Sequence, residues 1–376
     1  MVTPKTAESA GPWSGTAIAT LSARDASAPC PLPGRGLSKG TLRLRAGTQR
    51  GSAVSVVIGI DVGATTISGG LVTTGGDTLA SVQAPTHRSG PGTAVHTLFE
   101  ILDDLVHRAR DQAMVVTGVG VGLPGLIDVE RGTMFGDMSL VPEFFGLPLA
   151  DRIADSTGLP AFVDNDVNAL TLGEWLFGLG RGAASLVVLA IGTGVGGGVI
   201  LGETLVRGHR YYGGELGHVT VDFHGRLCVC GGRGCLAAYV GGRLIETEAQ
   251  QVASFERHSR LLARAGGDPA AITSEMVFQA AADGDRFARG LVEDACDALA
   301  AGLGIIVNGL NPEVIVVTGG VAASLVPLER EILGRAGRYA FPPALAATHI
   351  HIVATAKDET VRGGAALVLY ELRRGR

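Results

Sequence analysis

The fold is decided at residues 54–72, which read VSVVIGIDVGATTISGGLV. A β-branched run of strand length ends in an aspartate and a glycine turn, and apolar residues resume directly after that turn. Residues 184–206, which read ASLVVLAIGTGVGGGVILGETLV, repeat this order of strand, glycine turn and strand. The repetition predicts an α/β protein with two halves built on one plan.

The segments around these two stretches supply further strands and helices. Residues 94–113 place apolar side chains at helical spacing, and residues 116–128, VTGVGVGLPGLID, follow as another strand. Helices dominate residues 240–310, and a buried strand at 312–322 enters a further glycine turn. Residues 359–376 are expected to form a terminal helix, whose basic C-terminal end suits the helix dipole.

Composition indicates a soluble globular chain that is large enough for two domains. Of its 376 residues, 46% are hydrophobic and 18% are charged. Glycine interrupts each apolar stretch well before the ~20 residues that a membrane helix needs. The net charge of −5 divides unevenly, because residues 1–53 carry +5 and the remainder therefore carries −10. We expect neither a membrane nor a nucleic-acid partner for this acidic body.

Residues 1–53 differ from the rest of the chain. They are rich in Ala, Ser, Gly, Pro and Arg and show no apolar periodicity, which predicts disorder. A start codon placed too far upstream is the alternative, with translation beginning near Val54 or Val56. The stretch has no continuous apolar core of a secretory signal, so we expect a cytoplasmic protein.

The two glycine turns are candidate phosphate-binding sites. In the first turn a carboxylate can face a metal ion while backbone N–H groups approach phosphate oxygens, and in the second a hydroxyl replaces the acid. Either turn alone could be a simple hairpin turn. Neither turn fits the lysine-bearing P-loop pattern or a dinucleotide fingerprint. The candidate residues are Asp61, Gly63, Thr65 and Thr66 in the first turn and Gly192, Thr193 and Gly194 in the second.

A third candidate lies at residues 163–169, which read VDNDVNA. An apolar strand precedes this segment, and the helical pattern ALTLGEWLFG follows it. Asp166 at such a junction can be held at a cleft and take a proton from a hydroxyl. Asp and Asn are also the usual helix N-caps, and the two interpretations are compatible.

Three of the five cysteines lie within residues 228–235, CVCGGRGC, shortly after the histidine of GGELGH. One imidazole and three thiolates complete a tetrahedral zinc site with no open position, so the metal would be structural. A disulfide and free core cysteines are the alternatives. A disulfide is disfavoured because three cysteines leave one unpaired and no secretory signal is present. The candidate ligands are His218, Cys228, Cys230 and Cys235.

From about residue 54 to residue 376 the chain resembles the ROK family of repressors, open reading frames and sugar kinases. The resemblance rests on DVGATT, GLPGLID, DNDVNA, AIGTGVGGGVI, GGELGH, the cysteine cluster and PEVIVVTGG, in this order. It implies a two-lobed kinase of the actin and hexokinase type, with a ribonuclease H-like sheet in each lobe and the active site between the lobes. The implied lobes are residues 54–170 plus 358–376, and residues 171–357 with the zinc loop.

The resemblance also implies roles for single residues. Asp166 would deprotonate the 6-hydroxyl of a hexose, and Gly122 would belong to the substrate-binding set. Sugar hydroxyls would be bound by Asn165, Glu215 and His218, the last of which would also bind zinc. Gly319 and Gly320 would bind the adenosine side of the nucleotide. The implied cofactors are ATP, Mg²⁺ and a structural Zn²⁺, and the implied assembly is a homodimer.

Two departures from the family pattern bear on the acceptor. Sugar kinases of this family usually place a sugar-binding glutamate where this chain has Ala237, and a Pro-Asn-Leu segment where it has residues 138–144, MSLVPEF. Losing one acceptor of a hydroxyl should redirect specificity. We therefore favour an amino sugar such as kanosamine, or a C7 cyclitol, over glucose. Ordinary glucokinase activity, a non-catalytic sugar-binding regulator and a polyphosphate donor remain open.

Overall fold

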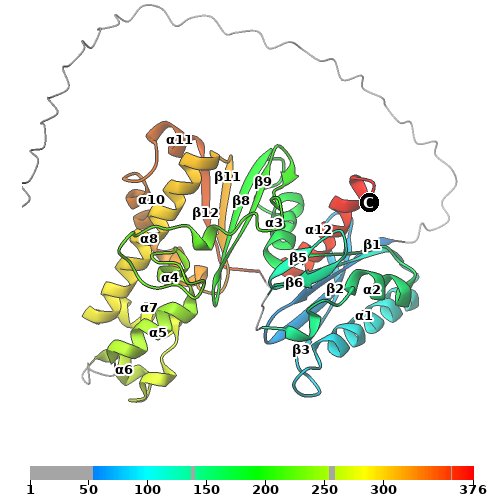
Figure 1. Cartoon of the computed structure of the whole chain (residues 1–376), viewed down its shortest axis with the longest axis horizontal. Helices are drawn as coiled ribbons and strands as arrows, with labels where there is room; N and C mark the ends of the chain where they lie inside the picture. The colour runs from blue at the N-terminus through cyan, green and yellow to red at the C-terminus, as the bar shows by residue number, and fades with distance from the viewer. Residues whose placement is uncertain (1–53, 137–139, 254–258, 357) are drawn as a thin grey trace, which may run out of the picture. The chain divides into compact units, whose positions relative to one another are not determined.

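The computed structural model describes residues 54–136, 140–253, 259–356 and 358–376. The prediction for residues 1–53 lies outside the described residues. Two five-stranded sheets with their helices lie within the unit Gly51–Arg376, and a short two-stranded sheet accompanies the first of them (Figure 1).

The first sheet has the strand order β3-β2-β1-β4-β7. β1 pairs antiparallel with β2 and parallel with β4, β2 pairs antiparallel with β3, and β7 lies parallel to β4. The sheet therefore combines a three-stranded meander with two added parallel strands. Its strands are β1 (Ser55–Val62), β2 (Thr66–Thr73), β3 (Thr78–Pro85), β4 (Val115–Leu123) and β7 (Ala161–Asn165).

β1 is buried on both faces, which explains its nearly continuous apolar sequence. One face packs with α1 (Ala94–Asp111), while Val57 on the other face packs with α12 (Glu359–Arg373). Gly59 lets α12 approach closely, because a Cβ at this position would overlap the carbonyl oxygen of Val361. The predicted terminal helix is thus confirmed, and it covers the strand that begins the fold.

The strand predicted at residues 116–128 is divided in two. β4 ends at Leu123, and β5 (Leu126–Asp128) instead pairs with β6 (Thr133–Phe135). Pro124 has no N–H for a strand ladder, and Gly125 has a φ of +105°. The backbone therefore turns between β4 and β5. Two short helices follow, η1 (Pro142–Phe144) and α2 (Leu149–Thr157).

The second sheet has the order β10-β9-β8-β11-β12. β8 pairs antiparallel with β9 and parallel with β11, and β12 lies parallel to β11. Both sheets thus share one arrangement of antiparallel and parallel neighbours, as the repeated sequence pattern predicts. The strands are β8 (Ser185–Ile191), β9 (Val195–Leu201), β10 (Thr204–Leu205), β11 (Val314–Thr318) and β12 (His349–Ile352).

Helices follow β10 as predicted. The long helix α8 supplies much of the hydrophobic cluster that packs with the second sheet. No helix within the described ranges is long and apolar enough to span a membrane. The helices are α4 (Ala237–Val240), α5 (Gly242–Ala253), α6 (Arg260–Arg264), α7 (Ser274–Ala282), α8 (Arg286–Leu310), α9 (Ala322–Leu325), α10 (Glu329–Ala336) and α11 (Pro342–Ala347). The 3₁₀ turns are η2 (Leu216–His218), η3 (Pro269–Ala271) and η4 (Val326–Leu328).

α3 (Asp166–Phe177) follows β7 and runs alongside α12 (Figure 1). Its residue Leu172 packs in one cluster with Leu186 and Val188 of β8. The helix therefore continues past residue 170, where the predicted lobe boundary was drawn, and contacts the second sheet. The division into lobes at residues 170 and 358 stays a prediction.

Candidate active site

Two aspartates, Asp61 and Asp164, lie on either side of Gly122 at the carboxyl ends of three parallel strands. Asp61 of β1 lies in register with Gly122 of β4, and Gly122 lies in register with Asp164 of β7. Asp166 follows as the first residue of α3, and a Cβ on Gly122 would lie 3.1 Å from its Cα. Gly122 thus allows the start of α3 to lie directly over β4. The carboxyl ends of parallel strands are a usual place for ligands in α/β proteins.

Asn165 is the N-cap of α3, as one of the two sequence interpretations of this segment requires. Its Oδ1 accepts hydrogen bonds from the N–H groups of Val167 at 2.9 Å and Asn168 at 3.0 Å. Such a cap is worth about 1 kcal/mol. Its Nδ2 donates to the Gly125 carbonyl oxygen at 3.1 Å and to Asp166 Oδ1 at 2.9 Å. A sugar hydroxyl would have to exchange with one of these partners to bind Asn165.

The two carboxyls of Asp61 and Asp166 have unusual proton affinities. Burial and, to a smaller extent, the charge of Asp61 together raise the pKa of Asp166 to about 7, against hydrogen bonds from Val167 and Asn165. Burial likewise raises the pKa of Asp61 to about 6, opposed by a hydrogen bond with Thr360. A carboxyl that titrates near neutrality suits proton transfer, so Asp166 has the properties of a general base.

The first predicted phosphate site is the hairpin turn between β1 and β2. The Gly63 N–H donates to the carbonyl oxygen of Thr66 at 2.9 Å, and Thr86 Oγ1 donates to the carbonyl oxygen of Gly63 at 2.7 Å. Thr65 is exposed, and Thr66 is half-buried. The turn is therefore a true hairpin turn whose outer face is accessible. This geometry is compatible with the predicted phosphate contact.

The second glycine run has two structural roles. Gly192, Thr193 and Gly194 form the turn between β8 and β9, as predicted, and are at least partly exposed. The three glycines at 196–198 lie inside β9, beyond this turn. A side chain on the first or third would collide with Val167 or Thr171 of α3. Their backbone closeness to α3, and not turn geometry, requires glycine there.

The glycine turn at 319–321, which was predicted to bind the adenosine side of the nucleotide, lies next to the turn at 192–194. The Val321 N–H donates to the carbonyl oxygen of Ile191 at 2.9 Å, and the Gly242 N–H donates to the carbonyl oxygen of Gly192 at 2.9 Å. Gly319 has a φ of +110° and lies so close to Ile191 that a side chain would overlap its carbonyl oxygen. Gly320 is exposed. The structure therefore brings the turns at 192–194 and 319–321 together with the start of α5.

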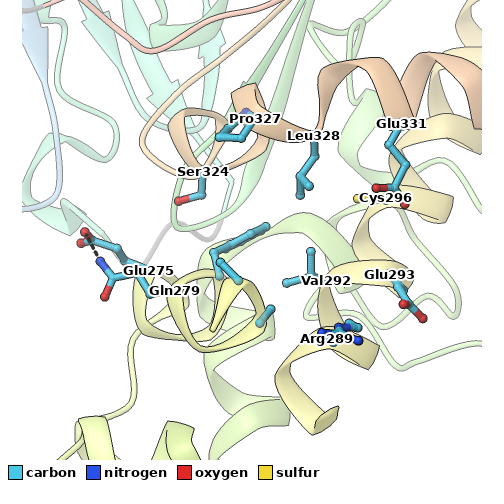
Figure 2. A pocket seen from close by; sticks show the side chains of 13 residues that line it. Glu275, Gln279, Arg289, Val292, Glu293, Cys296, Ser324, Pro327, Leu328 and Glu331 are labelled. Carbon is cyan, nitrogen blue, oxygen red and sulfur yellow. Dashed lines mark hydrogen bonds between the residues drawn. The ribbon is translucent and has the colours of Figure 1, made fainter. Parts of the chain in front are cut away.

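Figure 2 shows a cavity of about 460 Å³ that is lined in part by Ser324, whose N–H donates to the carbonyl oxygen of Val321 at 3.0 Å. Ser324, Pro327 and Leu328 form one wall, and Val292 of α8 faces them. Glu275, at the start of α7, lies near the end of the cavity that Ser324 borders (Figure 2). Its volume suits a drug-sized ligand. Apart from the glycine turn before Ser324, the sequence carries no signal for this cavity, because its lining comes from three separate helical segments.

The loop with the predicted sugar ligands Glu215 and His218 packs on β9. A side chain on Gly197 would overlap the carbonyl oxygen of Gly214, and a side chain on Gly217 would overlap that of Val195. Glu215 is exposed, and His218 is half-buried in η2. Successive residues of β9 point to opposite faces, so α3 lies on one face of the strand and this loop lies on the other.

The predicted metal ligands come together. The ligand atoms of His218 and the three cysteines lie within 4.8 Å of one another. Cys228 Sγ is 3.5 Å from His218 Nδ1, and Cys230 Sγ is 3.7 Å from Cys235 Sγ. Tetrahedral zinc would separate a sulfur from a nitrogen by about 3.6 Å and two sulfurs by about 3.8 Å. The donor set therefore fits zinc, and His218 Nε2 remains on the other side of the ring.

All four described cysteines are free thiols, so the structure forms no disulfide among them. Burial raises the pKa of Cys235 to about 12, while the N–H of Gly232 lowers the pKa of Cys230. Cys296, for which the sequence suggests no role, is buried in α8 and borders the cavity.

Ala237 is 4% exposed and begins α4 two residues after Cys235. Its neighbours Leu236 and Ala238 belong to the hydrophobic cluster of the second sheet. At the position where the family pattern has a sugar-binding glutamate, this chain therefore presents only a methyl group. The other altered segment is described only in part, since residues 137–139 lie outside the described residues.

Comparison with known proteins places the chain in a family. A glucokinase of Thermotoga maritima is 32% identical over 320 residues, which cover 83% of this chain and 96% of that protein. The crystal structure of a ROK hexokinase from Thermus thermophilus has a TM-score of 0.71 at 30% identity, covering 85% of this chain and 100% of that chain.

A third relative was solved in a complex with two ligands. The structure of a ROK family glucokinase from Streptomyces griseus, in complex with glucose and AMPPNP, has a TM-score of 0.65 at 28% identity and covers 83% of this chain and 98% of that chain. The predicted two-lobed, actin- and hexokinase-like fold class is confirmed, and the protein is a sugar kinase. The chain belongs to the ROK family, whose model matches residues 57–371.

Proposed function

We propose that this kinase transfers the γ-phosphoryl group of ATP to the primary hydroxyl of a glucose-like acceptor. The observation that carries this proposal is Asp166, whose pKa is raised to about 7 at the carboxyl ends of parallel strands. Asp166 lies on the helix that packs against β9, and β9 begins at the second glycine turn. One element thus links the proposed base to the proposed phosphate site.

The transfer needs one proton acceptor and a set of donors around the phosphate. The acceptor hydroxyl oxygen forms a bond to the γ-phosphorus as the bond to the leaving oxygen of ADP breaks, and Asp166 accepts the hydroxyl proton. Backbone N–H groups and hydroxyls of the glycine turns hold the phosphates in line. Asn165 keeps one oxygen of Asp166 in place, since its Nδ2 donates to Oδ1 at 2.9 Å.

The site also suits a magnesium ion. Mg²⁺ prefers oxygen ligands and usually binds through one or two carboxylates and the substrate phosphates. Asp61 supplies a carboxylate beside the first turn, and Thr65 and Thr66 supply hydroxyls close by. When bound, the ion neutralises charge on the phosphates. Asp61 would hold the ion, and Asp166 would keep the proton-transfer role.

The adenosine part of ATP would lie against the turn at Gly319 and Gly320. Beyond this turn the chain continues into Ser324 at the edge of the cavity in Figure 2. Ser274, at the N-terminus of α7, lies near Gly242, whose N–H bonds to the second phosphate turn. These contacts support a nucleotide that spans the turn at 192–194 and the mouth of the cavity.

The acceptor is proposed to be an amino sugar such as kanosamine, or a C7 cyclitol, in preference to glucose. Ala237 supports this, because a site that lacks a carboxylate at one hydroxyl loses much of its discrimination there. Glu215 and His218 would still bind other hydroxyls. Ordinary glucokinase activity is the alternative, and the similarity to glucokinases favours it.

A substrate panel tests the proposed activity and the acceptor together. Purified enzyme with ATP and Mg²⁺ is given glucose, mannose, N-acetylmannosamine, kanosamine and a valienone-type cyclitol, and the phosphorylated product is identified by ³¹P NMR. We expect one phosphate on the primary hydroxyl and the best kcat/KM with kanosamine or the cyclitol. Glucose as the best substrate would refute the preference but support the kinase. ATP consumption without any phosphorylated product would refute the function.

We also propose that His218 and the three cysteines hold one structural zinc ion. The ligand distances support this, and a closed four-ligand site leaves no position for a reacting water. The zinc would fix the loop that carries Glu215. Metal analysis of carefully purified protein should find about one zinc per chain, and C228S should abolish it. Less than about half a zinc per chain in the parent protein would contradict this proposal.

A homodimer and a cytoplasmic location stay predictions.

A further inference from the structure

Arg207, two residues after β10, makes a buried ion-pair network that the catalytic scheme does not use. Its Nε and Nη2 donate to Asp164 Oδ2 at 2.8 and 2.7 Å, and Nη2 also donates to Glu371 Oε1 at 2.6 Å. The side chains of Asp164 and Glu371 are each 2% exposed, and that of Arg207 is 13% exposed. One guanidinium therefore bridges the end of β7 and the C-terminal helix α12.

The network extends from Asp164 to the proposed base. Asp164 Oδ1 accepts from the N–H of Asn165 at 2.7 Å and from Asn168 Nδ2 at 3.1 Å. Asn165 in turn caps α3 and donates from Nδ2 to Asp166 Oδ1. Arg207 thus holds one oxygen of Asp164, and the other oxygen of Asp164 holds the residue that orients Asp166. None of the residues in this chain of contacts is exposed.

The charges around Arg207 explain why an apolar residue is a poor replacement. Burial by itself lowers the pKa of Arg207, but Asp164 and Glu371 raise it above its ordinary value, so the guanidinium stays charged. Arg376 also contacts Glu371, at 3.4 Å, whereas Asp164 has no cation partner other than Arg207 among the contacts of the described residues. Loss of Arg207 would leave Asp164 buried without a cation, which is costly.

We propose that Arg207 is a positioning residue for phosphoryl transfer, acting through Asp164 and Asn165 on Asp166. This rests on the proposed function in one respect, namely that Asp166 is the base. Arg207 lies on the same loop as Glu215 and His218, so it also joins the sugar-binding loop to the base. Glu371 anchors the guanidinium from the opposite side, and its side-chain hydrogen bonds among the described residues go to Arg207 and Arg376 and not to Asp164, Asn165 or Asp166.

The test compares the two sides of this bridge. R207M removes the guanidinium, R207K keeps the charge but loses the planar fork, and E371Q is the matched control that keeps a hydrogen-bond acceptor on α12. We expect R207M to lower kcat about 10- to 100-fold because the base is misplaced. The acceptor KM should change by less than about threefold, R207K should restore part of kcat, and E371Q should stay within about twofold of the parent kcat.

A second measurement does not depend on activity. In amide hydrogen exchange, R207M should speed the exchange of the Asn165, Val167 and Asn168 N–H groups, and E371Q should not. A purely structural role predicts equal effects of R207M and E371Q on melting temperature, kcat and exchange, and that result would overturn the proposal. If R207M does not fold, R207K provides both measurements. A parent enzyme that phosphorylates no acceptor would refute the proposed function alone, and hydrogen exchange would still decide the role of Arg207.

Discussion

β1 and β8 take the same place in the strand order of their sheets, yet different chemical groups lie at their carboxyl ends. β1 ends beside Asp61 and lies near Asp166, whereas β8 ends at Ile191 and leads into Gly192 and Thr193. The first edge holds two desolvated carboxyls, and the second presents backbone and hydroxyl groups. One topology thus supplies an acidic edge suited to protons and metal ions and a neutral edge suited to phosphates.

The largest expected effect comes from the acidic edge. D166N removes the proton acceptor but keeps the size of the side chain, so kcat should fall about 10³-fold while acceptor binding persists. D151N, which changes an exposed acid of α2, should leave kcat within about twofold. Steady-state kinetics and calorimetric sugar binding measure the two quantities. A D166N enzyme with nearly parental kcat would mean that the acidic edge does not act as the base.

The neutral edge should affect nucleotide binding instead. T193A removes one hydroxyl from the second turn, and we expect the KM for ATP to rise about tenfold with a smaller change in kcat. T204A is the matched control, since Thr204 is an exposed threonine of β10. Initial rates at varied ATP concentration separate the two variants. An unchanged KM for ATP in T193A would remove the predicted contrast between the edges.

The third expected effect concerns the choice of acceptor. A237E restores the carboxylate that the family pattern has at this position, and it should raise the kcat/KM for glucose relative to the best analogue about tenfold. A237Q is the control, because it adds the same bulk without the charge. Competition between glucose and the analogue in one reaction gives the ratio directly. Equal ratios in the parent enzyme and A237E would show that Ala237 does not set the preference.

The sequence predicted the elements whose signals are local. Strands β1, β8 and β11, the helices at 94–111 and 359–373 and the two turns follow from apolar periodicity and glycine, and the structure confirms them. The cysteine spacing predicted a cluster of four ligand atoms, which the structure also forms. These features depend on neighbours that are close in sequence.

Features that depend on distant segments were not predictable in this way. The glycines at 196–198 look like a continued turn, but they are required by α3 and by the loop at 213–218, which approach β9 from both faces. The pairing of Arg207 with Asp164 and Glu371 joins residues that are 43 and 164 positions apart. A lone arginine carries no sequence signal for such a bridge. The raised pKa of Asp166 likewise comes from burial and from Asp61, neither of which the motif reveals.

The central claim is that Asp166 is the proton acceptor and that its burial sets its pKa near neutrality. The most direct test is the pH dependence of kcat/KM for the acceptor between about pH 5.5 and about pH 9, because kcat/KM reports the pKa of a group before the acceptor binds. Because only the ionised carboxyl accepts a proton, kcat/KM should rise with pH and reach a plateau above an apparent pKa of about 7. A kcat/KM that does not change across this range would contradict the claim.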